Sequence, residues 1–416
     1  MLARSFILLA LLLSPITRAA PADWPQFRGP TGQGVSAATH VPLKWSDTQN
    51  VAWRTPLPGT GWSSPVLADD RLYLTAAVKD PTANATTLRA LCLDAPTGRA
   101  LWDVEVFRPD AAALRATHQK NSPASPTPVV RAGRLYVHFG HMGTAALDLT
   151  GKVLWRQTDL RYDPVHGNGG SPILTEDNAL IFNADSGDNP FVAALSADTG
   201  KLLWRTPRNT PARSRFSFST PLEITVNGRR QVVSAGSGLV AAYDPADGRE
   251  IWRITYGQGY SVVPRPVFAQ GLLVLSTGFD RATLLAVRPE GASGDATQSH
   301  VVWKITRNAP LTPSPVVVGD EVYVVSDNGF ATCADLKTGK VHWSQRLDGN
   351  FSASPVAAEG RVYFTDESGI TTVVRAATQF EVLARNETGQ RTLASPAIAD
   401  NALYLRTQSH LLRIEP

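Results

Sequence analysis

Sulfur is scarce in this sequence, which has only two cysteines, Cys92 and Cys333, and two methionines among 416 residues. The cysteines occupy equivalent positions, RALCLD and FATCAD, in two separate copies of a repeated pattern. A disulfide requires Cα atoms within about 7 Å of each other, which repeats that are not neighbours do not offer. We therefore expect both cysteines to be buried free thiols.

An excess of charge of one sign is missing as well. The formal net charge is +4, and the sequence has no cluster of Lys and Arg. This balance argues against binding to nucleic acid and against attraction to an anionic membrane. The motifs of common hydrolases are also absent: there is no Gly-x-Ser-x-Gly elbow, no His-Glu-x-x-His helix and no phosphate-binding loop ending in Lys. We predict no catalytic residue.

Long apolar runs are confined to the first residues, MLARSFILLALLLSPITRAA. Arg4, the apolar run from Phe6 to Leu13 and the small residues Ala19 and Ala20 are typical of a secretory signal. The run is too short to span a membrane, and no Cys follows it as a lipoprotein anchor. We expect residues 1–20 to be a signal peptide and residues 21–416 to form one soluble domain, periplasmic or secreted.

What the sequence does contain is a repeat. A small or polar residue and a Pro precede an apolar strand, a turn and an aromatic strand, as in SSPVLADDRLYL and PSPVVVGDEVYVV. A period near 45 residues with about four short strands per unit predicts an all-β, eight-bladed β-propeller of four-stranded antiparallel blades. The longest connection contains VFRPDAAALRATHQK, the best candidate for a short helix. The marker prolines are 40 to 49 residues apart, with one gap of 63: Pro65, Pro128, Pro172, Pro221, Pro266, Pro315, Pro355 and Pro396.

Most units end in a second pattern, a turn of the Asp-x-x-Thr-Gly kind followed by Trp, as in LDAPTGRALW and ADLKTGKVHW. The Asp side chain accepts hydrogen bonds from the turn, and Gly adopts the positive φ that a hairpin needs. The large apolar ring suits the wedge between neighbouring blades. Unit seven, RAATQFEVLARN, has Leu383 in place of the Trp. The predicted blade-docking residues are Trp53, Trp102, Trp155, Trp204, Trp252, Trp303 and Trp343.

The eighth unit stops at LRIEP and lacks an outer strand of its own. The N-terminal segment NVAWRTPL, with Trp53, has the pattern of the missing strand. We therefore predict that the N-terminal strand completes the last blade, which closes the ring and leaves no open sheet edge.

These repeats resemble those of known propellers. The Asp-x-x-Thr-Gly-x-x-x-Trp and Ser-Pro patterns look like those of quinoprotein (PQQ-type) dehydrogenases and of the BamB family of outer-membrane assembly lipoproteins. The segments WPQFRGPTGQGVS, HQKNSPASPTPV, FSFSTPL and SVVPRPVF further resemble exported PQQ-like propeller proteins. The resemblance runs from Trp24 to Ile414 and implies the propeller fold. The dehydrogenases typically have an adjacent Cys-Cys pair beside the quinone, and neither Cys here has a Cys neighbour. We expect no cofactor.

A ligand is expected at one rim of the central channel. In this strand order the connections into each Pro-marked strand and those between second and third strands meet there. The predicted ligand-binding residues are His118, Lys120, His141, His166, Arg215, Tyr260, Arg265, Asp280 and Arg281. Further rim candidates are Trp62, Gln119, Asn121, Asn168, Asp185, Asp188, Arg213, Asp327, Asn350, Phe351, Arg391 and His410.

Two groups of residues at this rim, histidines and arginines, suggest particular ligands. His118, His141 and His166 come from adjacent units, and imidazoles are good ligands for Zn or Cu. Their spacing matches no recognised metal pattern, so we favour solvated or hydrogen-bonded loop histidines and predict no metal site. The segment NADSGDNP lacks the ligand spacing of an EF-hand and is interpreted as a structural turn.

The arginines form the second group. Arg215, Arg265 and Arg281 come from consecutive units, with Arg391 as a further member, and paired N–H groups would hold a carboxylate, a sulfate or a glycan acid. The alternative is that they pack against the channel or pair with Asp185 and Asp280.

The function that we predict is an exported binding or assembly platform, a monomer that recognises a polypeptide or an anionic glycan-like ligand at the channel rim. The competing prediction is a quinoprotein-type or metal-dependent enzyme that uses the same funnel. Metal analysis and ultraviolet-visible absorbance of the protein from its native host would discriminate the two.

Overall fold

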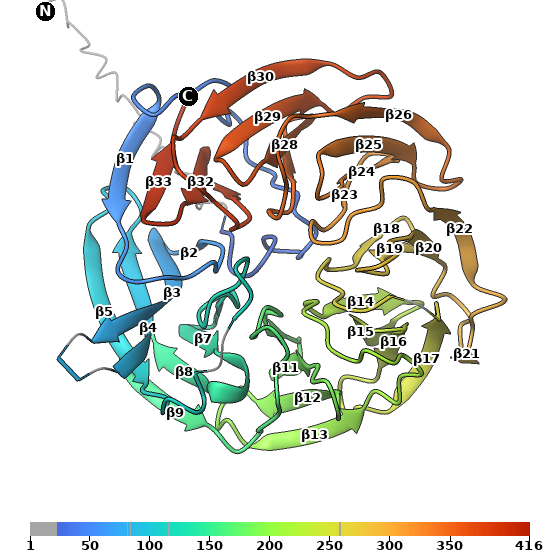
Figure 1. Ribbon diagram of the computed structural model, residues 1–416, viewed down its shortest axis with the longest axis horizontal. Helices are drawn as coiled ribbons and strands as arrows, with labels where there is room; N and C mark the ends of the chain where they lie inside the picture. Colours follow the sequence, from blue (N-terminus) through green and yellow to red (C-terminus); the bar gives the residue numbers. More distant parts are fainter. Residues whose placement is uncertain (1–22, 81, 84, 115–116, 258) are drawn as a thin grey trace, which may run out of the picture.

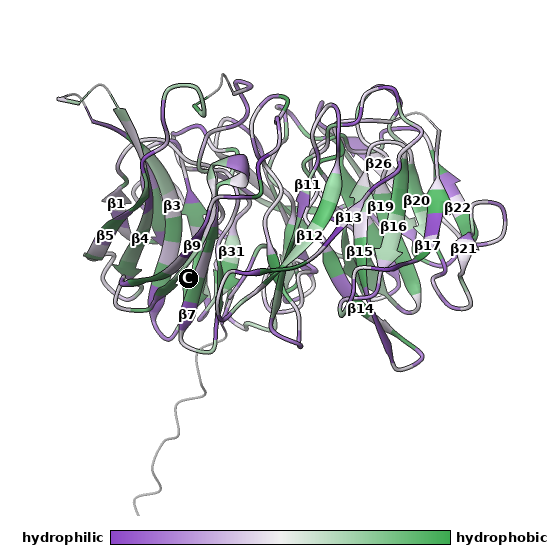
Figure 2. Cartoon of the chain, turned by 90° about the horizontal axis from the view of Figure 1, so that it is seen from below, coloured by the Kyte–Doolittle hydropathy of each residue, from purple (hydrophilic) through white to green (hydrophobic). Residues whose placement is uncertain are grey.

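The computed structural model describes residues 23–416 except 81, 84, 115, 116 and 258, so the predicted signal peptide, residues 1–20, lies outside the described residues. Eight sheets surround a central channel like the blades of a propeller (Figure 1). Seen from the side, apolar residues follow the strands, and hydrophilic residues gather in the loops at the two faces (Figure 2). The predicted all-β fold with eight antiparallel blades is confirmed.

The first four blades follow one another along the chain, each with its innermost strand first. Blade one contains β2 (Val66–Ala68), β3 (Arg71–Asp80), β4 (Ala85–Asp94) and β5 (Ala100–Phe107); blade two contains β6 (Val129–Arg131), β7 (Arg134–His138), β8 (Thr144–Asp148) and β9 (Val153–Gln157); blade three contains β10 (Ile173–Leu174), β11 (Ala179–Ala184), β12 (Phe191–Ser196) and β13 (Leu202–Pro207); blade four contains β14 (Leu222–Val226), β15 (Arg229–Gly236), β16 (Leu239–Tyr243) and β17 (Glu250–Thr255).

The remaining blades continue the same order. Blade five contains β18 (Val267–Ala269), β19 (Leu272–Ser276), β20 (Leu284–Val287) and β22 (Val301–Ile305); blade six contains β23 (Val316–Val318), β24 (Glu321–Val325), β25 (Phe330–Asp335) and β26 (Val341–Arg346); blade seven contains β27 (Val356–Ala358), β28 (Arg361–Thr365), β29 (Ile370–Arg375) and β30 (Val382–Glu387); blade eight contains β31 (Ala397–Ala399), β32 (Ala402–Arg406), β33 (His410–Ile414) and β1 (Val51–Pro56).

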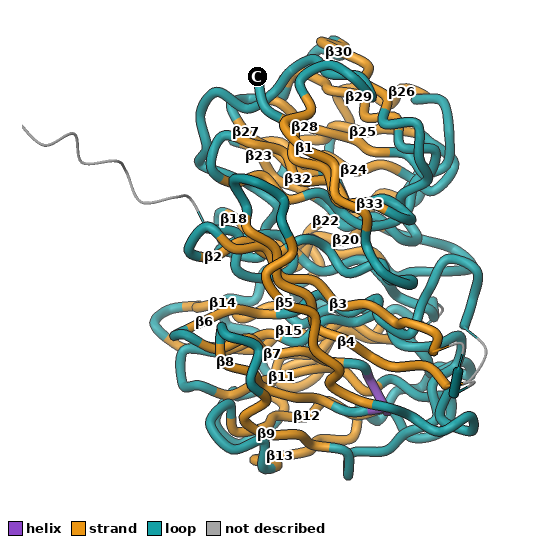
Figure 3. The backbone as a smooth tube through the Cα atoms, turned by 90° about the vertical axis from the view of Figure 1, so that its left-hand side faces the viewer, coloured by secondary structure: helices purple, strands orange, loops and turns teal. Residues whose placement is uncertain are grey.

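The ring closes as predicted. β1 pairs antiparallel with β33, from Val51 opposite Ile414 to Pro56 opposite His410. Figure 3 shows the two strands side by side at the end of the molecule where the chain terminates. The sheet of blade four has a fifth strand. The enlarged turn before Trp303 contributes β21 (Gly294–Asp295), which pairs parallel with β17.

The predicted short helix is wrong. Within the described part of VFRPDAAALRATHQK, the backbone leaves β5 and continues as turns and irregular chain. The one helical segment among the described residues is a single 3₁₀ turn, η1 (Gly140–Met142), and no described helix is long and apolar enough to cross a membrane.

Six of the seven predicted outer-strand tryptophans form a hydrogen bond to the next blade. Trp53 donates its indole N–H to the carbonyl oxygen of Ala95 in the turn of blade one at 2.9 Å, and Trp155 donates in the same way to Ala197 of blade three at 2.9 Å. Trp102, Trp204, Trp303 and Trp343 repeat this contact, whereas Trp252 bonds to Gln231 of its own blade. The motif therefore couples neighbouring blades through ring packing and one hydrogen bond.

The turn glycine also belongs to this contact. Gly200 has a φ of +71°, and a Cβ built on it would lie 2.5 Å from the ring of Trp155 in the previous blade. We predict that Gly200→Ala lowers the free energy of unfolding by roughly 3 kcal/mol, since backbone strain and overpacking add. Gly228→Ala is the matched control, because Gly228 has a φ of +76° with no atom within 4 Å of its Cβ position. Urea unfolding should show a loss of only about 1 kcal/mol there; equal losses would contradict the role of the Trp contact.

Both cysteines are free and buried, as predicted. Burial raises the pKa of Cys92 and of Cys333 to about 12, so neither thiol ionises near neutral pH.

The segment Trp24–Trp45, here called the strap, was not anticipated. Its first part crosses the channel at the face opposite the predicted rim. Trp24 pairs with Leu67 of blade one, Val130 of blade two donates its N–H to the Pro25 carbonyl, and Ser36 donates to Ala357 of blade seven. The strap therefore closes one end of the channel (Figure 1).

The second part of the strap supplies blade seven with the tryptophan that its outer strand lacks. Trp45 stacks on Tyr363 of β28 with ring centroids 6.5 Å apart and an interplanar angle of 18°. In blade one the corresponding Tyr73 packs on the outer-strand Trp102 of the same blade, at 6.0 Å. Trp45 thus occupies the place that Leu383 leaves unfilled, and Asn386 of β30 accepts the Trp45 backbone N–H at 2.9 Å.

Candidate functional site: a blind cavity at the channel mouth

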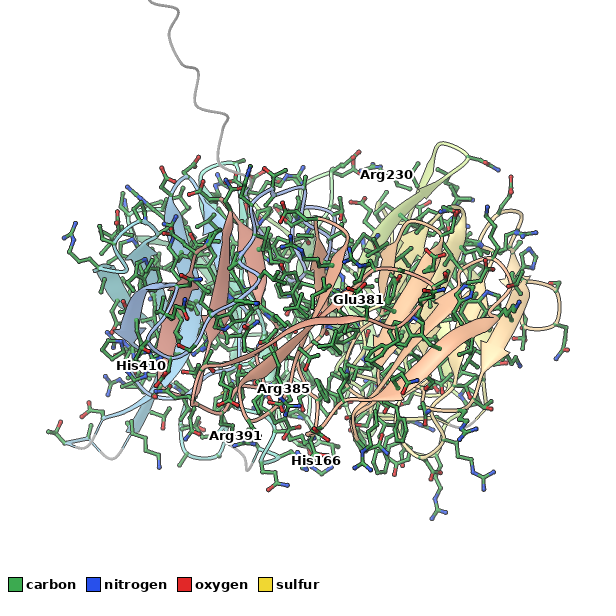
Figure 4. The ribbon with its side chains drawn as sticks, turned by 90° about the horizontal axis from the view of Figure 1, so that it is seen from above. His166, Arg230, Glu381, Arg385, Arg391 and His410 are labelled. Atoms are coloured by element: carbon green, nitrogen blue, oxygen red, sulfur yellow. The ribbon has the colours of Figure 1, made fainter. Side chains whose placement is uncertain are left out.

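A cavity of about 520 Å³ opens at the face opposite the strap, with lining residues from all eight blades. Figure 4 shows His166 and Arg391 on this face and Arg230 on the other. Phe27 of the strap lines the cavity as well, which places it at the closed end. The cavity is therefore blind: a ligand enters and leaves through the same mouth.

The lower wall consists of the small residues that precede the marker prolines. The backbone N–H of Ser64 donates to the Thr127 hydroxyl at 2.9 Å, and Thr127 donates in the same way to Ser171 at 2.9 Å. The same contact links Ser171 to Thr220, Ser314 to Ser354, and Ser354 to Ser395. We call Ser64, Thr127, Ser171, Thr220, Ser314, Ser354 and Ser395 the hydroxyl ring; it explains why a hydroxyl so often precedes the Pro in this repeat.

Arg265 interrupts the hydroxyl ring in unit five. Its backbone N–H still donates to Ser314 Oγ at 2.9 Å, but its side chain turns beneath the ring. There the guanidinium donates to the carbonyl oxygens of Pro221 at 3.0 Å and of Phe27 at 2.6 Å. Burial lowers the pKa of Arg265 to about 9, which leaves it charged at neutral pH.

The upper wall carries a row of aromatic rings from units two to five. His118 packs on His166 with ring centroids 5.7 Å apart, His166 on Phe216 at 5.3 Å, Phe216 on Tyr260 at 5.5 Å, and Tyr260 on Phe279 at 5.5 Å. We call these five residues the aromatic arc. Phe279 is 50% exposed, so the arc presents apolar surface to an incoming ligand.

Part of the mouth is covered by the long connection from blade one to blade two. Lys120 forms an ion pair with Glu367 of blade seven at 2.7 Å, and Arg391 of blade eight donates to the Gln119 carbonyl at 3.5 Å. The His118 N–H donates to the His166 carbonyl in unit three. The 63-residue gap between the first two marker prolines therefore encodes a loop that reaches across the cavity mouth.

The structure brings four of the nine predicted ligand-binding residues to the cavity lining, namely His118, Lys120, His166 and Tyr260. The candidates Trp62, Asn121 and Asp327 line it too. Sequence reasoning missed Phe216 and Phe279 of the aromatic arc. The aromatic residues of FSFSTPL were the available signal for the first.

The predicted arginine group is wrong as drawn from the sequence. Arg265 is buried under the floor, and Arg215 donates to the Asp188 carbonyl at 3.1 Å outside the cavity lining. Asp280 and Arg281 are exposed and do not line the cavity either. The three guanidinium groups do not converge, because one loop residue turns inward and two turn outward.

The hypothesis of a histidine-bound metal fails on geometry. His141 Nε2 bonds to the Ala113 carbonyl at 2.8 Å, and its Nδ1 faces the Asn168 amide at 3.0 Å. The ring of His141 packs on Tyr162 and not on His118 or His166. Within the described ranges, no group of three or more His, Cys, Asp or Glu side chains could hold a metal ion.

The residues of the cavity do not fit a quinone with its calcium ion. The carboxylates at the mouth are already engaged, since Asp327 accepts the N–H groups of Leu311 and Thr312, and Glu367 pairs with Lys120. Calcium is held by carboxylate and carbonyl oxygens, whereas the side chains of this wall offer hydroxyl groups that already accept backbone N–H groups. The two cysteines lie within separate blades and cannot form a vicinal pair.

The fold places the chain in the class of eight-bladed β-propellers with four-stranded antiparallel blades. The sequence model of the family described as Outer membrane protein assembly factor BamB matches residues 43–158, 188–292 and 292–414, and the chain belongs to this family.

The chain is similar to individual relatives of two kinds, assembly factors and dehydrogenases. The chain is 25% identical over 301 residues to the outer membrane protein assembly factor BamB of Shewanella oneidensis, covering 67% of this chain and 71% of the relative. It is also 26% identical over 358 residues to the quinohemoprotein alcohol dehydrogenase ADH IIB of Pseudomonas putida, covering 77% of this chain but 49% of that enzyme. The crystal structure of BamB from Moraxella catarrhalis superposes with a TM-score of 0.62 at 14% identity, over 88% of this chain and 99% of that one, which shows a shared fold.

Proposed function

We propose that the protein is an exported platform for protein assembly that holds an unfolded polypeptide segment in the blind cavity. The observation that carries this proposal is the aromatic arc. Five aromatic rings, two of them imidazoles, lie in edge contact above a wall of hydroxyl groups, and the apolar ring of Phe279 is 50% exposed. Apolar side chains of a polypeptide pack on such rings, and its polar backbone matches the hydroxyl groups.

Membership of the BamB family supports the same proposal, because the name of these relatives describes assembly of outer membrane proteins. Assembly factors act on chains that still expose apolar side chains, which is the chemistry that the arc offers. The similarity to a quinohemoprotein dehydrogenase is weaker support for an enzyme, since the cavity lacks the donor set for that cofactor.

We predict that replacing Phe216 and Phe279 together by Ala weakens binding of a fluorescein-labelled, aromatic-rich peptide about tenfold or more. Aromatic contacts contribute about 0.5–1.5 kcal/mol each beyond their area burial, and about 1.4 kcal/mol corresponds to a factor of ten. Fluorescence anisotropy gives the dissociation constants. Leu203→Ala is the control, because Leu203 is 54% exposed on the outer strand β13, away from the cavity lining. Binding that survives the double replacement would overturn the proposed site.

A further inference from the structure

Three fully buried arginines surround the lower cavity. Arg265 bonds to the carbonyl of Phe27, which lines the cavity. Arg28 bonds to the carbonyls of Pro315 at 2.6 Å and Pro355 at 3.0 Å, next to Ser314 and Ser354 of the hydroxyl ring. Each guanidinium is thus one residue away from the cavity surface.

The third arginine lies behind the wall. Arg406 of β32 donates to the Ser63 hydroxyl at 2.6 Å and to the Ser63 carbonyl at 3.2 Å, beside Ser64 of the hydroxyl ring. The Nε groups of Arg28 and Arg406 are buried and have no hydrogen-bond partner in the described part of the chain.

None of the three has a carboxylate partner among the described residues; their acceptors are backbone carbonyls and one serine hydroxyl. Burial lowers the pKa of Arg28 and of Arg406 to about 9, so both remain charged at neutral pH. Positive charge that no carboxylate offsets, in a low-dielectric surrounding, makes the floor of the cavity favourable for an anion.

The hydroxyl ring adds hydrogen-bond donors. The hydroxyl oxygens of Thr127, Ser171 and Thr220 each accept a backbone N–H from the preceding unit. Within the ranges that the structure describes, their own O–H groups have no protein acceptor, so these hydrogens are available to a ligand. The ring is therefore rich in donors where the charge is positive, and donors directed at an anion are stronger than those between neutral groups.

The shape of the cavity indicates which kind of molecule could present an anionic group at the floor. Phe27 and the strap close the floor, so a chain that continues past the floor cannot be accommodated. The walls above the floor are aromatic, which suits apolar side chains close to the anion. A carboxylate at the end of an apolar segment meets all three conditions.

From this geometry we propose that the cavity binds the C-terminal carboxylate of a polypeptide whose last residues are apolar or aromatic, with the carboxylate at the hydroxyl ring and the side chains on the aromatic arc. This inference rests on the proposed function, because it names which part of the polypeptide the cavity accepts.

The test compares three N-terminally fluorescein-labelled peptides on the unmodified mature protein. They share one aromatic-rich sequence and end in a free carboxylate, in a carboxamide, or in a free carboxylate after three added Gly/Ser residues. We expect the free acid to bind about tenfold or more tightly than the amide, and the extended peptide to bind as weakly as the amide. Unlabelled 3-phenylpropionate should compete with the free acid.

The outcomes separate the two proposals. Equal affinity of acid and amide would overturn the carboxylate site and leave polypeptide binding intact, as would an extended peptide as tight as the free acid. Absence of binding by all three peptides would overturn the proposed function itself. Binding of 3-phenylpropionate alone would show that the floor takes a small carboxylic acid and would overturn the polypeptide as its source.

A protein variant gives an independent readout. Arg265→Met should reduce the preference for acid over amide to about threefold or less, and Arg265→Lys should retain most of the preference. A preference unchanged in a folded Arg265→Met protein would overturn the role of Arg265. If the variant does not fold, the comparison of peptides on the unmodified protein still decides the proposal.

Discussion

A chain that begins after Pro56 should fail to fold as a stable monomer. Without β1, the strand β33 loses its antiparallel partner from Val51 to Pro56, and its backbone groups form an open edge. The strap is lost at the same time, including the fully buried Trp24 and Arg28. We expect a loss on the order of 5 kcal/mol or more, comparable with the whole stability of many domains, measured by thermal denaturation and analytical size exclusion.

A second truncation separates closure from the strap. A chain that begins at Ser46 keeps β1 but lacks Trp45 and the residues that close the floor. It should remain a closed ring with an intermediate melting temperature and should expose the floor of the cavity. If the chain that begins after Pro56 keeps the parental melting temperature and stays monomeric, ring closure by the N-terminal strand is wrong.

Breaking the buried ion pair between Asp185 and Arg208, which directly follow β11 and β13 of blade three, should have the second largest effect. Asp185 was predicted at the rim, but the structure buries it against Arg208, and both side chains are fully inaccessible. Arg208 Nε and Nη2 both donate to the Asp185 carboxylate, and Nη2 also donates to the Ser234 hydroxyl at 2.6 Å. Asp185→Asn or Arg208→Met should each lower the free energy of unfolding by about 3–5 kcal/mol, because either change leaves its partner charged and buried.

Two comparisons by urea unfolding sharpen this result. The double replacement Asp185→Leu with Arg208→Met removes both charges and should cost clearly less than the sum of the single losses. Arg134→Met is the surface control, since Arg134 and Asp198 form a pair at 2.6 Å with side chains 34% and 59% exposed, and it should cost less than about 1 kcal/mol. Additive single losses would mean that the two residues act separately.

The strand and turn patterns of the repeats could be predicted from the sequence, because each pattern acts within a few residues. Asp94 accepts hydrogen bonds from the N–H and hydroxyl of Thr97, as the Asp-x-x-Thr-Gly pattern predicted. The failed helix in the long connection shows the limit of such signals. Lys120 there pairs with Glu367, some 250 residues away in sequence, and no local pattern encodes that contact.

The candidate site was predictable only in part. Loop residues of consecutive units had to face one channel, and His118, His166 and Tyr260 do so. Whether a side chain points into the cavity, under its floor or outward depends on rotamers and neighbours that the repeat does not specify. Arg265 shows this: it stands at a hydroxyl position of the ring, yet its longer side chain reaches the strap below.

By itself the sequence determined the number of blades, the order of their strands and the closure of the ring, because strand periodicity, turn chemistry and the missing outer strand are all properties of the chain. Only the tertiary structure decided that the strap blocks one end of the channel, that Trp45 replaces the missing Trp of blade seven, and that five rings from four units form one arc. The physical reason is that these contacts join segments up to about 320 residues apart, as between Trp45 and Tyr363, and their geometry exists only once the ring has closed.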